Sequence, residues 1–476
     1  MVLSNMRMWL STNIASVVFL ASYFLTVVLG NILYLLPSVR NYLANTPYMA
    51  PVFDFDTLFS LGYWVLLLSP FVVTPFIVVL VRRLSRPVLV KLVGFFPEFS
   101  RTSYLVVLLL CYAVVGYSFW HADVFRLFLG GSDFISSVEA RFEIRERVSF
   151  MSMALLMSNL HFLAIYSVVR LVREAGLWWW GIVVGNTLVM TVLLVVLNMK
   201  WPVIIFYAGL VLVVFMYSPR RPYLKAVMGM IALLLVYVLI SAFVYRVSVP
   251  SAPSLTGDRP SVTQSLSSDD VAVDLSVPKT ENGNENNINN MGISPKRAVK
   301  PVEEGGRYVV ALGSEIGGRI PQMMLHAVNR MAILYPYYYE ISTKEGVLCG
   351  GLLAQAHAGQ KCRPSFYIYN KIFNDQFDGR GTAPAAVHIT AYALGGWPLA
   401  AVGLLCASVL LGLFAALPSS SNSLVAAMAT TGGVLGYHLS QLPGEGPIIY
   451  DHGVLWTIVM LVGYALVVRV FRIVKK

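Results

Sequence analysis

The chain has 476 residues, of which 57% are hydrophobic and only 12% are charged, and its formal net charge is +11. Together with a mean hydropathy of +0.69, this composition excludes a soluble globular protein and is typical of an integral membrane protein. Because the basic residues are scattered between apolar segments, the positive charge does not indicate a nucleic-acid surface.

Apolar segments of about 20 residues can cross the roughly 30 Å hydrocarbon core of a bilayer as helices. In chain order, the predicted spans lie near residues 13–36, 57–81, 103–120, 150–169, 176–197, 202–218, 226–245, 388–416, 424–441 and 453–470. The first lies in a stretch without charged residues between Arg7 and Arg40, and it has no small-residue cleavage site. We therefore expect a retained helix rather than a signal peptide.

This pattern predicts an all-α integral membrane protein with about ten transmembrane helices. Residues 1–246 hold spans one to seven, and residues 388–476 hold spans eight to ten. Loops rich in Lys and Arg stay in the cytoplasm, and an N-terminus placed inside puts the basic loops near 82–101, 170–173 and 220–225 inside too. Both termini are therefore expected in the cytoplasm, with a large loop between spans seven and eight on the other side.

The large loop has two parts of different composition. Residues 247–304 are rich in Ser, Asn and Pro and poor in aromatic residues, which predicts a disordered tether. Residues 305–387 carry apolar residues at helical spacing after Pro321, which predicts an ordered subdomain. Cys349 and Cys362 both lie in this subdomain. An oxidising compartment permits a disulfide between them, and two free thiols are the alternative.

Several cations fall on the predicted outer side. They are Arg141, Arg145 and Arg147 in the loop 121–149, Lys200 between two spans, and Arg307, Arg319, Arg330, Arg363 and Arg380 in the large loop. The planar guanidinium suits bidentate binding of a diphosphate. Two alternatives remain: the arginines of loop 121–149 pair with neighbouring glutamates along an exposed helix, and Lys200 is an ordinary snorkelling anchor.

Histidines on the same side are candidates for a general base, because imidazole titrates near neutral pH. His388 follows Arg380 by eight residues and lies beside the sequence GRGTAP, whose glycines allow close approach of a ligand to the backbone. His326 lies on the helix predicted after Pro321. The alternatives are a structural histidine at the start of span eight and a satisfied polar face on that helix.

Asp54 and Asp56 precede span two, where they fit either a metal or base site or an ordinary helix start. The sequence has no H-E-x-x-H motif, no paired C-x-x-C, no Walker A motif and no dinucleotide-binding loop. We therefore expect neither a metal site nor a cofactor, and an ATP-driven pump is disfavoured.

The layout and three segments resemble the O-antigen or oligosaccharide repeat-unit polymerases (Wzy-like) of bacterial inner membranes. The segments are LNMKWPVIIFYAGLVLVV at 197–214, NRMAILYPYYYEI at 329–341 and GRGTAPAAVHITAYALGGWPLAAVG at 379–403. The resemblance implies a GT-C-like glycosyltransferase that transfers a growing glycan from undecaprenyl diphosphate onto the next lipid-linked repeat unit at the periplasmic face. It also implies a chain-length regulator and a flippase as partners, with no nucleic acid.

Cations must then stabilise the leaving diphosphate, and a base must take the proton of the acceptor hydroxyl. The expected catalytic residues are His388, Arg380 and Arg330, and the expected substrate-binding residues are Arg319, Arg145, Lys200, His326, Tyr338 and Tyr392. The tyrosines would stack on sugars, and the alternative for them is an interfacial aromatic belt.

Two other functions remain open. An O-antigen ligase would use the same chemistry with lipid A core as acceptor, and the sequence does not separate the two acceptors. A transporter of lipid-linked glycans or sugars would predict charged or broken helices in the middle of the membrane. Apart from His161, the predicted spans are nearly free of ionisable residues, which favours chemistry at the membrane surface.

Overall fold

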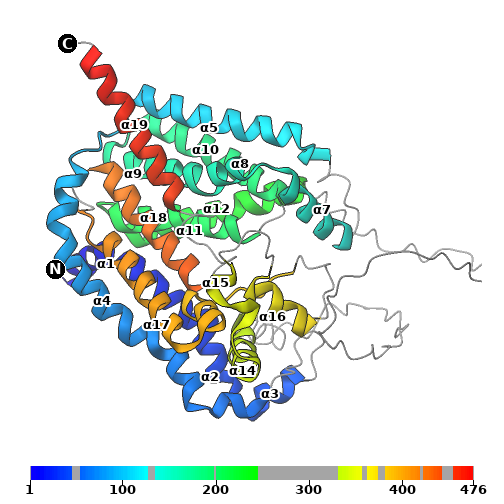
Figure 1. The fold of residues 1–476 in the computed structure, drawn as a ribbon. Coiled ribbons are helices and arrows are strands. Elements are labelled where there is room, and N and C mark those ends of the chain that lie inside the picture. The colour runs from blue at the N-terminus through cyan, green and yellow to red at the C-terminus, as the bar shows by residue number, and fades with distance from the viewer. Residues whose placement is uncertain are drawn as a thin grey trace, which may run out of the picture. The chain divides into compact units, whose positions relative to one another are not determined.

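The protein is described by a computed structural model that covers residues 2–44, 54–126, 134–197, 200–244, 331–355, 362–373, 381–418, 422–441 and 454–474. Within these ranges every element is a helix (Figure 1). The predicted tether 247–304 and the first part of the predicted subdomain, 305–330, lie outside the described residues. The all-α prediction is therefore confirmed for the part of the chain that is described.

The helices before the large loop are α1 (Val2–Tyr23), the π-helical turn η1 (Phe24–Val28), α2 (Leu29–Tyr34), α3 (Pro37–Ala44), the 3-10 turn η2 (Phe55–Phe59), α4 (Leu61–Val93), α5 (Arg101–His121), α7 (Phe134–Arg147), α8 (Phe150–Ala154), the π-helical turn η3 (Leu155–Leu160), α9 (His161–Glu174), α10 (Leu177–Val196), α11 (Lys200–Tyr217) and α12 (Pro222–Val244). Those after it are α14 (Leu334–Glu345), the 3-10 turn η4 (Leu348–Gly350), α15 (Gly351–Gln355), α16 (Pro364–Phe373), α17 (Val387–Ala415), α18 (Ser423–Ser440) and α19 (Val454–Val474).

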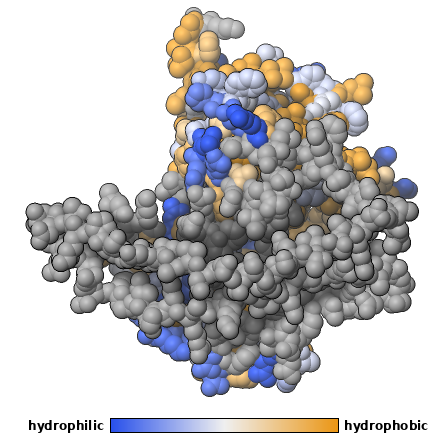
Figure 2. All heavy atoms as spheres, turned by 90° about the vertical axis from the view of Figure 1, so that its right-hand side faces the viewer, coloured by the Kyte–Doolittle hydropathy of each residue, from blue (hydrophilic) through white to orange (hydrophobic). Residues whose placement is uncertain are grey.

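Among the described residues, eight helical segments are long and apolar enough to cross a membrane. They are Trp9–Tyr34, Leu61–Val93, Arg101–His121, Phe150–Glu174, Leu177–Val196, Pro222–Ser241, Val387–Ala415 and Val454–Val474. Many of their apolar side chains are exposed, such as Val72 and Phe76 on α4, and Figure 2 shows apolar side chains over much of the described surface at the top of that view. An apolar exposed surface of this kind suits contact with lipid, so the chain is a multi-pass membrane protein.

The other two predicted spans, 202–218 and 424–441, are also helical, as α11 and α18. The apolar part of α11, Pro202–Tyr217, is shorter than a full span. Thr430, Thr431 and His438 make α18 less apolar, and most of its residues are buried. Eight of the ten predicted spans are thus confirmed as candidates, and crossing by α11 and α18 stays a prediction.

Helix α18 lies in close contact with α1. A Cβ added at Gly436 would lie 2.2 Å from the carbonyl oxygen of Ala15 and 3.2 Å from the backbone nitrogen of Phe19. Real Cβ atoms do not approach a backbone so closely, so the two helix backbones meet only because residue 436 is glycine. The contact places α1 beside Ser440, the last residue of α18.

Helix α17 is two helices that meet at a sharp turn. Gly395 and Gly396 have non-helical backbone angles, and φ is +65° at Gly396, a conformation that favours glycine. A Cβ added at Gly403 would lie 2.9 Å from the Cβ of Ala391 and 3.8 Å from the Cα of His388. In a continuous helix, Gly403 and His388 would be roughly 22 Å apart along the axis, so the chain folds back on itself.

This turn divides the predicted span 388–416, which remains one of the eight candidates, into two parts. The second part of α17, 397–415, has a length of roughly 28 Å and can cross the hydrocarbon core without the first part. The first part, 387–394, folds back beside it and is mostly buried. His388 therefore lies on a short internal half-helix, not at the end of a transmembrane helix.

Helices α14, η4, α15 and α16 form what we call the cap. All four contact α17, and α14 also contacts η2. The backbone nitrogen of Asp54 donates to Glu340 Oε2 at 2.8 Å, and a Cβ at Gly351 would lie 3.2 Å from the carbonyl oxygen of Leu394. The cap thus covers the turn of α17 and the start of α4.

Candidate functional site

Only part of the predicted site falls within the described residues. The residues outside them are Arg319, His326, Arg330 and Arg380. Lys200 begins α11, where the structure describes the backbone and not the side chain. The predicted site residues with described side chains are Arg145, Tyr338, His388 and Tyr392.

His388 is fully buried, and its ring contacts residues of α1 and α4. Its Nε2 atom lies 3.2 Å from the hydroxyl oxygen of Tyr23, and the two rings meet edge to face with centroids 5.4 Å apart. Its Nδ1 atom has no hydrogen-bond partner among the described residues. One ring nitrogen is thus engaged by the protein, and the other has an unused hydrogen-bonding position.

A proline in α4 affects the backbone groups that lie beside His388. Pro70 lies inside α4 and has no N–H, so the carbonyl of Leu66, one turn earlier, has no helical partner. The backbone of Leu66 interacts with the His388 imidazole, and the next carbonyl, that of Leu67, accepts a hydrogen bond from the Tyr23 hydroxyl at 3.1 Å. The missing N–H of Pro70 therefore leaves the Leu66 carbonyl available to the histidine, and the neighbouring Leu67 carbonyl accepts from its tyrosine partner.

The segment that leads into the half-helix is extended and buried. Ala383, Ala385 and Ala386 are at most 1% exposed. Ala383 donates its N–H to the carbonyl of Ser365 at 2.9 Å, and its own carbonyl accepts from the Tyr338 hydroxyl at 2.7 Å. Non-helical backbone at membrane depth is tolerated only when the protein supplies its hydrogen bonds. Here, residues of the cap supply them.

Tyr335 completes this support. Its hydroxyl accepts the N–H of Ala386 at 2.8 Å and donates to the carbonyl of Ser440 at 3.2 Å. Ser440 in turn shares a hydrogen bond with Ser22 on α1 at 2.8 Å. The residue two positions before His388 is therefore fixed to both α14 and α18.

The predicted sugar-binding tyrosines lie in two different environments. The Tyr338 ring is fully buried, so its predicted contact with a sugar stays a prediction. Tyr392 is largely buried, and its ring stacks on Tyr339 at 5.7 Å and meets Trp397 edge to face at 5.5 Å. Trp397 is exposed. Of this aromatic group, Trp397 is the member with an accessible face.

Gly381 has a packing role that differs from the predicted one. The sequence GRGTAP indicated a backbone open to a ligand, but the ring of Tyr369 covers Gly381. A Cβ added there would lie 1.9 Å from Cε1 of Tyr369. The glycine thus allows close packing against α16 rather than close approach of substrate.

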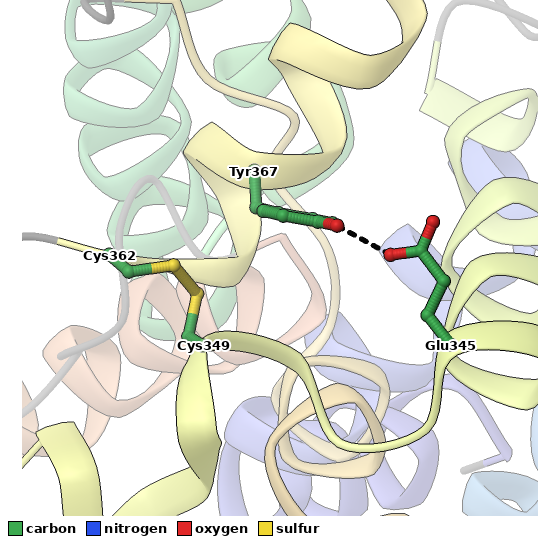
Figure 3. Close-up of a disulfide and its surroundings, with 4 residues drawn as sticks. All are labelled: Glu345, Cys349, Cys362 and Tyr367. Atoms are coloured by element: carbon green, nitrogen blue, oxygen red, sulfur yellow. Dashed lines mark hydrogen bonds between the residues drawn. A yellow bond between two sulfur atoms is a disulfide. The ribbon is translucent and has the colours of Figure 1, made fainter. Parts of the chain in front are cut away.

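The cap is closed by a disulfide between Cys349 and Cys362 (Figure 3), which decides between the two alternatives that the sequence left open. Beside it, Glu345 accepts hydrogen bonds from the Tyr367 hydroxyl and, at 2.7 Å, from Lys371 Nζ. Burial raises the pKa of Glu345, but these hydrogen bonds outweigh it and hold the pKa below its usual value. The hydrogen bond to Glu345 raises the pKa of Lys371. Both side chains are substantially exposed, so the pair contributes at most about 1 kcal/mol.

The structure bears on two alternative explanations offered by the sequence, the pairing of charges on α7, seen at Arg147, and the capping role of Asp54. On α7, Arg147 forms an ion pair with Glu143 one turn earlier, as expected for an exposed helix that pairs its own charges, and Arg145 is exposed on the same helix. Asp54 caps η2, because its side chain accepts the N–H of Asp56 at 3.1 Å. Across the described ranges, no three His, Cys, Asp or Glu side chains gather as metal ligands.

Sequence reasoning missed the residues that hold His388. Tyr23 was counted as part of an apolar span, and Tyr335 as one of several tyrosines that would stack on sugars or form an interfacial aromatic belt. The available signal was weak: a tyrosine in the middle of span one, and a tyrosine followed by Pro336. No protein-family model, curated protein or solved structure matches this chain, so the functional argument rests on the site itself.

Proposed function

We propose that this protein is a membrane glycosyltransferase that polymerises undecaprenyl-diphosphate-linked oligosaccharide repeat units at the periplasmic face of the inner membrane. The acceptor hydroxyl would attack the anomeric carbon, the bond from that carbon to the diphosphate oxygen would break, and the lipid diphosphate would leave. The hydroxyl proton would pass to a base, and arginines would stabilise the diphosphate.

The observation that carries the proposal is the placement of His388. It lies on an internal half-helix beneath the cap, and its Nδ1 has no partner among the described residues. Arg380 immediately precedes Gly381, where the buried segment leading to His388 begins. A base and a cation on one short segment match the two needs of the reaction.

The burial of His388 adds a requirement. The ring has no exposed surface, so an acceptor hydroxyl reaches Nδ1 only after neighbouring groups move. Catalytic contacts are often incomplete before substrate binds. The proposal therefore includes an opening beside the half-helix when lipid-linked substrate enters.

A transporter of lipid-linked glycans or sugars is the second candidate, and the turn at Gly395 and Gly396 favours it. Interrupted helices form the substrate sites of many transporters. The other buried histidine named by the sequence, His161, gives it no further support, because Nδ1 lies 2.9 Å from the Leu156 carbonyl oxygen. An O-antigen ligase shares the proposed chemistry and differs in its acceptor.

Substitutions at the proposed base and cation test this function in cells. Because a positioned base contributes roughly 10²- to 10⁴-fold, His388→Ala and Arg380→Ala should abolish polymer while the protein level is unchanged. Arg330→Lys keeps the charge but loses the bidentate fork, so it should reduce polymer. Wild-type polymer from both alanine variants, measured by gel and immunoblot, would overturn the site assignment.

A further inference from the structure

The contact between Tyr23 and His388 determines which nitrogen of the histidine carries its proton. The Tyr23 hydroxyl has two neighbours: the carbonyl oxygen of Leu67 at 3.1 Å and His388 Nε2 at 3.2 Å. A hydroxyl has one hydrogen to donate, and a carbonyl can only accept. The hydrogen therefore goes to Leu67, and the tyrosine oxygen is left to accept from Nε2–H.

From this proton count we infer that Tyr23 is a positioning residue that holds neutral His388 with its proton on Nε2, so that Nδ1 is the atom that accepts a proton. The inference rests on the proposed function for its catalytic consequence, but the proton position follows from the hydrogen bonds alone. Nδ1 makes no hydrogen bond to a described residue, and the other backbone group that interacts with the imidazole is that of Leu66.

Packing keeps the Tyr23 hydroxyl in place. Tyr23 is fully buried, and its ring contacts Phe19, Phe71 and Tyr335 at centroid distances of 6.2, 6.0 and 6.0 Å. Tyr23 is also the last residue before the π-helical turn η1, and such turns often occur at functional sites. A ring held on several sides has little freedom to exchange its hydrogen-bond partners.

Tyr335 on α14 fixes the start of the half-helix. Tyr335 binds the N–H of Ala386 and the carbonyl of Ser440, and it also touches the Tyr23 ring. One tyrosine therefore sets the backbone position of His388, and the other sets the protonation of its ring.

This arrangement assigns the proton path in the proposed reaction. As the acceptor oxygen forms its bond to the anomeric carbon, its proton moves to the lone pair of Nδ1. The imidazolium that results donates Nε2–H to Tyr23, whose hydroxyl stays bonded to Leu67. The electron pair of the broken bond leaves with the diphosphate, so no further reactant is needed.

The proton position is measured by ¹⁵N NMR of histidine-labelled protein in lipid, with the His388 signals identified by their loss in His388→Asn. We expect an unprotonated Nδ1 and a protonated Nε2 in the wild type, and a mixture of tautomers in Tyr23→Phe. Tyr104→Phe is the matched control, because Tyr104 is equally buried and donates to the Leu163 carbonyl at 2.9 Å far from His388 in the sequence. A wild-type His388 protonated on Nδ1, or a tautomer unchanged in Tyr23→Phe, overturns the inference.

The kinetic arm uses the same variants with lipid-linked repeat units. Tyr23→Phe should lower kcat by roughly tenfold with little change in KM, since it disturbs the base and not substrate binding, and Tyr104→Phe should leave both unchanged. Equal losses in the two variants would contradict a positioning role. If the wild type forms no polymer at all, the proposed function fails, while the NMR result still decides the tautomer.

Discussion

At the scale of single residues, Tyr335 and Tyr338 show how side chains support an unusual path of the backbone. Their hydroxyls bond to the N–H of Ala386 and the carbonyl of Ala383, in the non-helical segment that precedes α17. The sequence predicted tyrosines that stack on sugars or form an interfacial belt, and it did not indicate the bond from Tyr338 to Ala383, which is 45 residues away. Hydrogen bonds over such separations leave no periodic pattern in a sequence.

Gly381 offers a direct test of this packing. Gly381→Ala places a methyl group within the Tyr369 ring, at 1.9 Å from Cε1, so we expect a loss of about 1–3 kcal/mol of stability from overpacking. The measurement is thermal unfolding in detergent. Gly463→Ala is the control, because a Cβ there meets no atom within 4 Å. Equal melting temperatures for the two variants would contradict the described contact.

At the scale of elements, α17 is where sequence and structure differ most. Residues 388–416 form a continuous apolar run, which predicted a single span. Hydropathy does not show whether the chain reverses its direction within such a run. The sequence did contain the signals of a turn, Gly395-Gly396 followed by Pro398. Gly403 then allows the two parts of α17, 387–394 and 397–415, to pack closely. No local sequence pattern indicates this contact.

A glycine-to-alanine substitution in α18 tests its close packing against α1. Gly436→Ala drives a methyl group into the backbone of Ala15, which cannot move aside without shifting α1. We expect a loss of about 1–3 kcal/mol and a lower melting temperature. Gly433→Ala, whose Cβ meets the side chain of Ile14 at 3.3 Å, should cost less. A smaller effect at Gly436 than at Gly433 would contradict the close crossing.

At the scale of the whole molecule, composition was enough to predict an all-helical membrane protein. Hydropathy located the spans because each helix that crosses the bilayer must itself be long and apolar enough to do so. It could not locate the site, because the contacts of His388 come from Tyr23 on α1 and Leu66 on α4, which are distant in sequence. Arg330 and Arg380 lie outside the described residues, so their place in the site stays a prediction.

The predicted orientation puts the cap on the periplasmic side, where its disulfide is stable. In a Cys111→Ser, Cys406→Ala background, Leu353→Cys on α15 and Leu177→Cys on α10 introduce exposed thiols. An impermeant maleimide applied to intact spheroplasts should label Leu353→Cys and should label Leu177→Cys only after permeabilisation. The reverse pattern would contradict the orientation and the proposed periplasmic reaction.

The measurement that tests the central claim most directly is polymerisation by the purified protein in liposomes. The host's undecaprenyl-diphosphate repeat units are supplied without nucleotide, added metal or lipid A core, and the products are separated on a gel. We predict a ladder spaced by one repeat unit that is lost in His388→Ala. A ladder absent until lipid A core is added would identify a ligase, and transfer of labelled lipid or sugar across the bilayer without any ladder would contradict the glycosyltransferase.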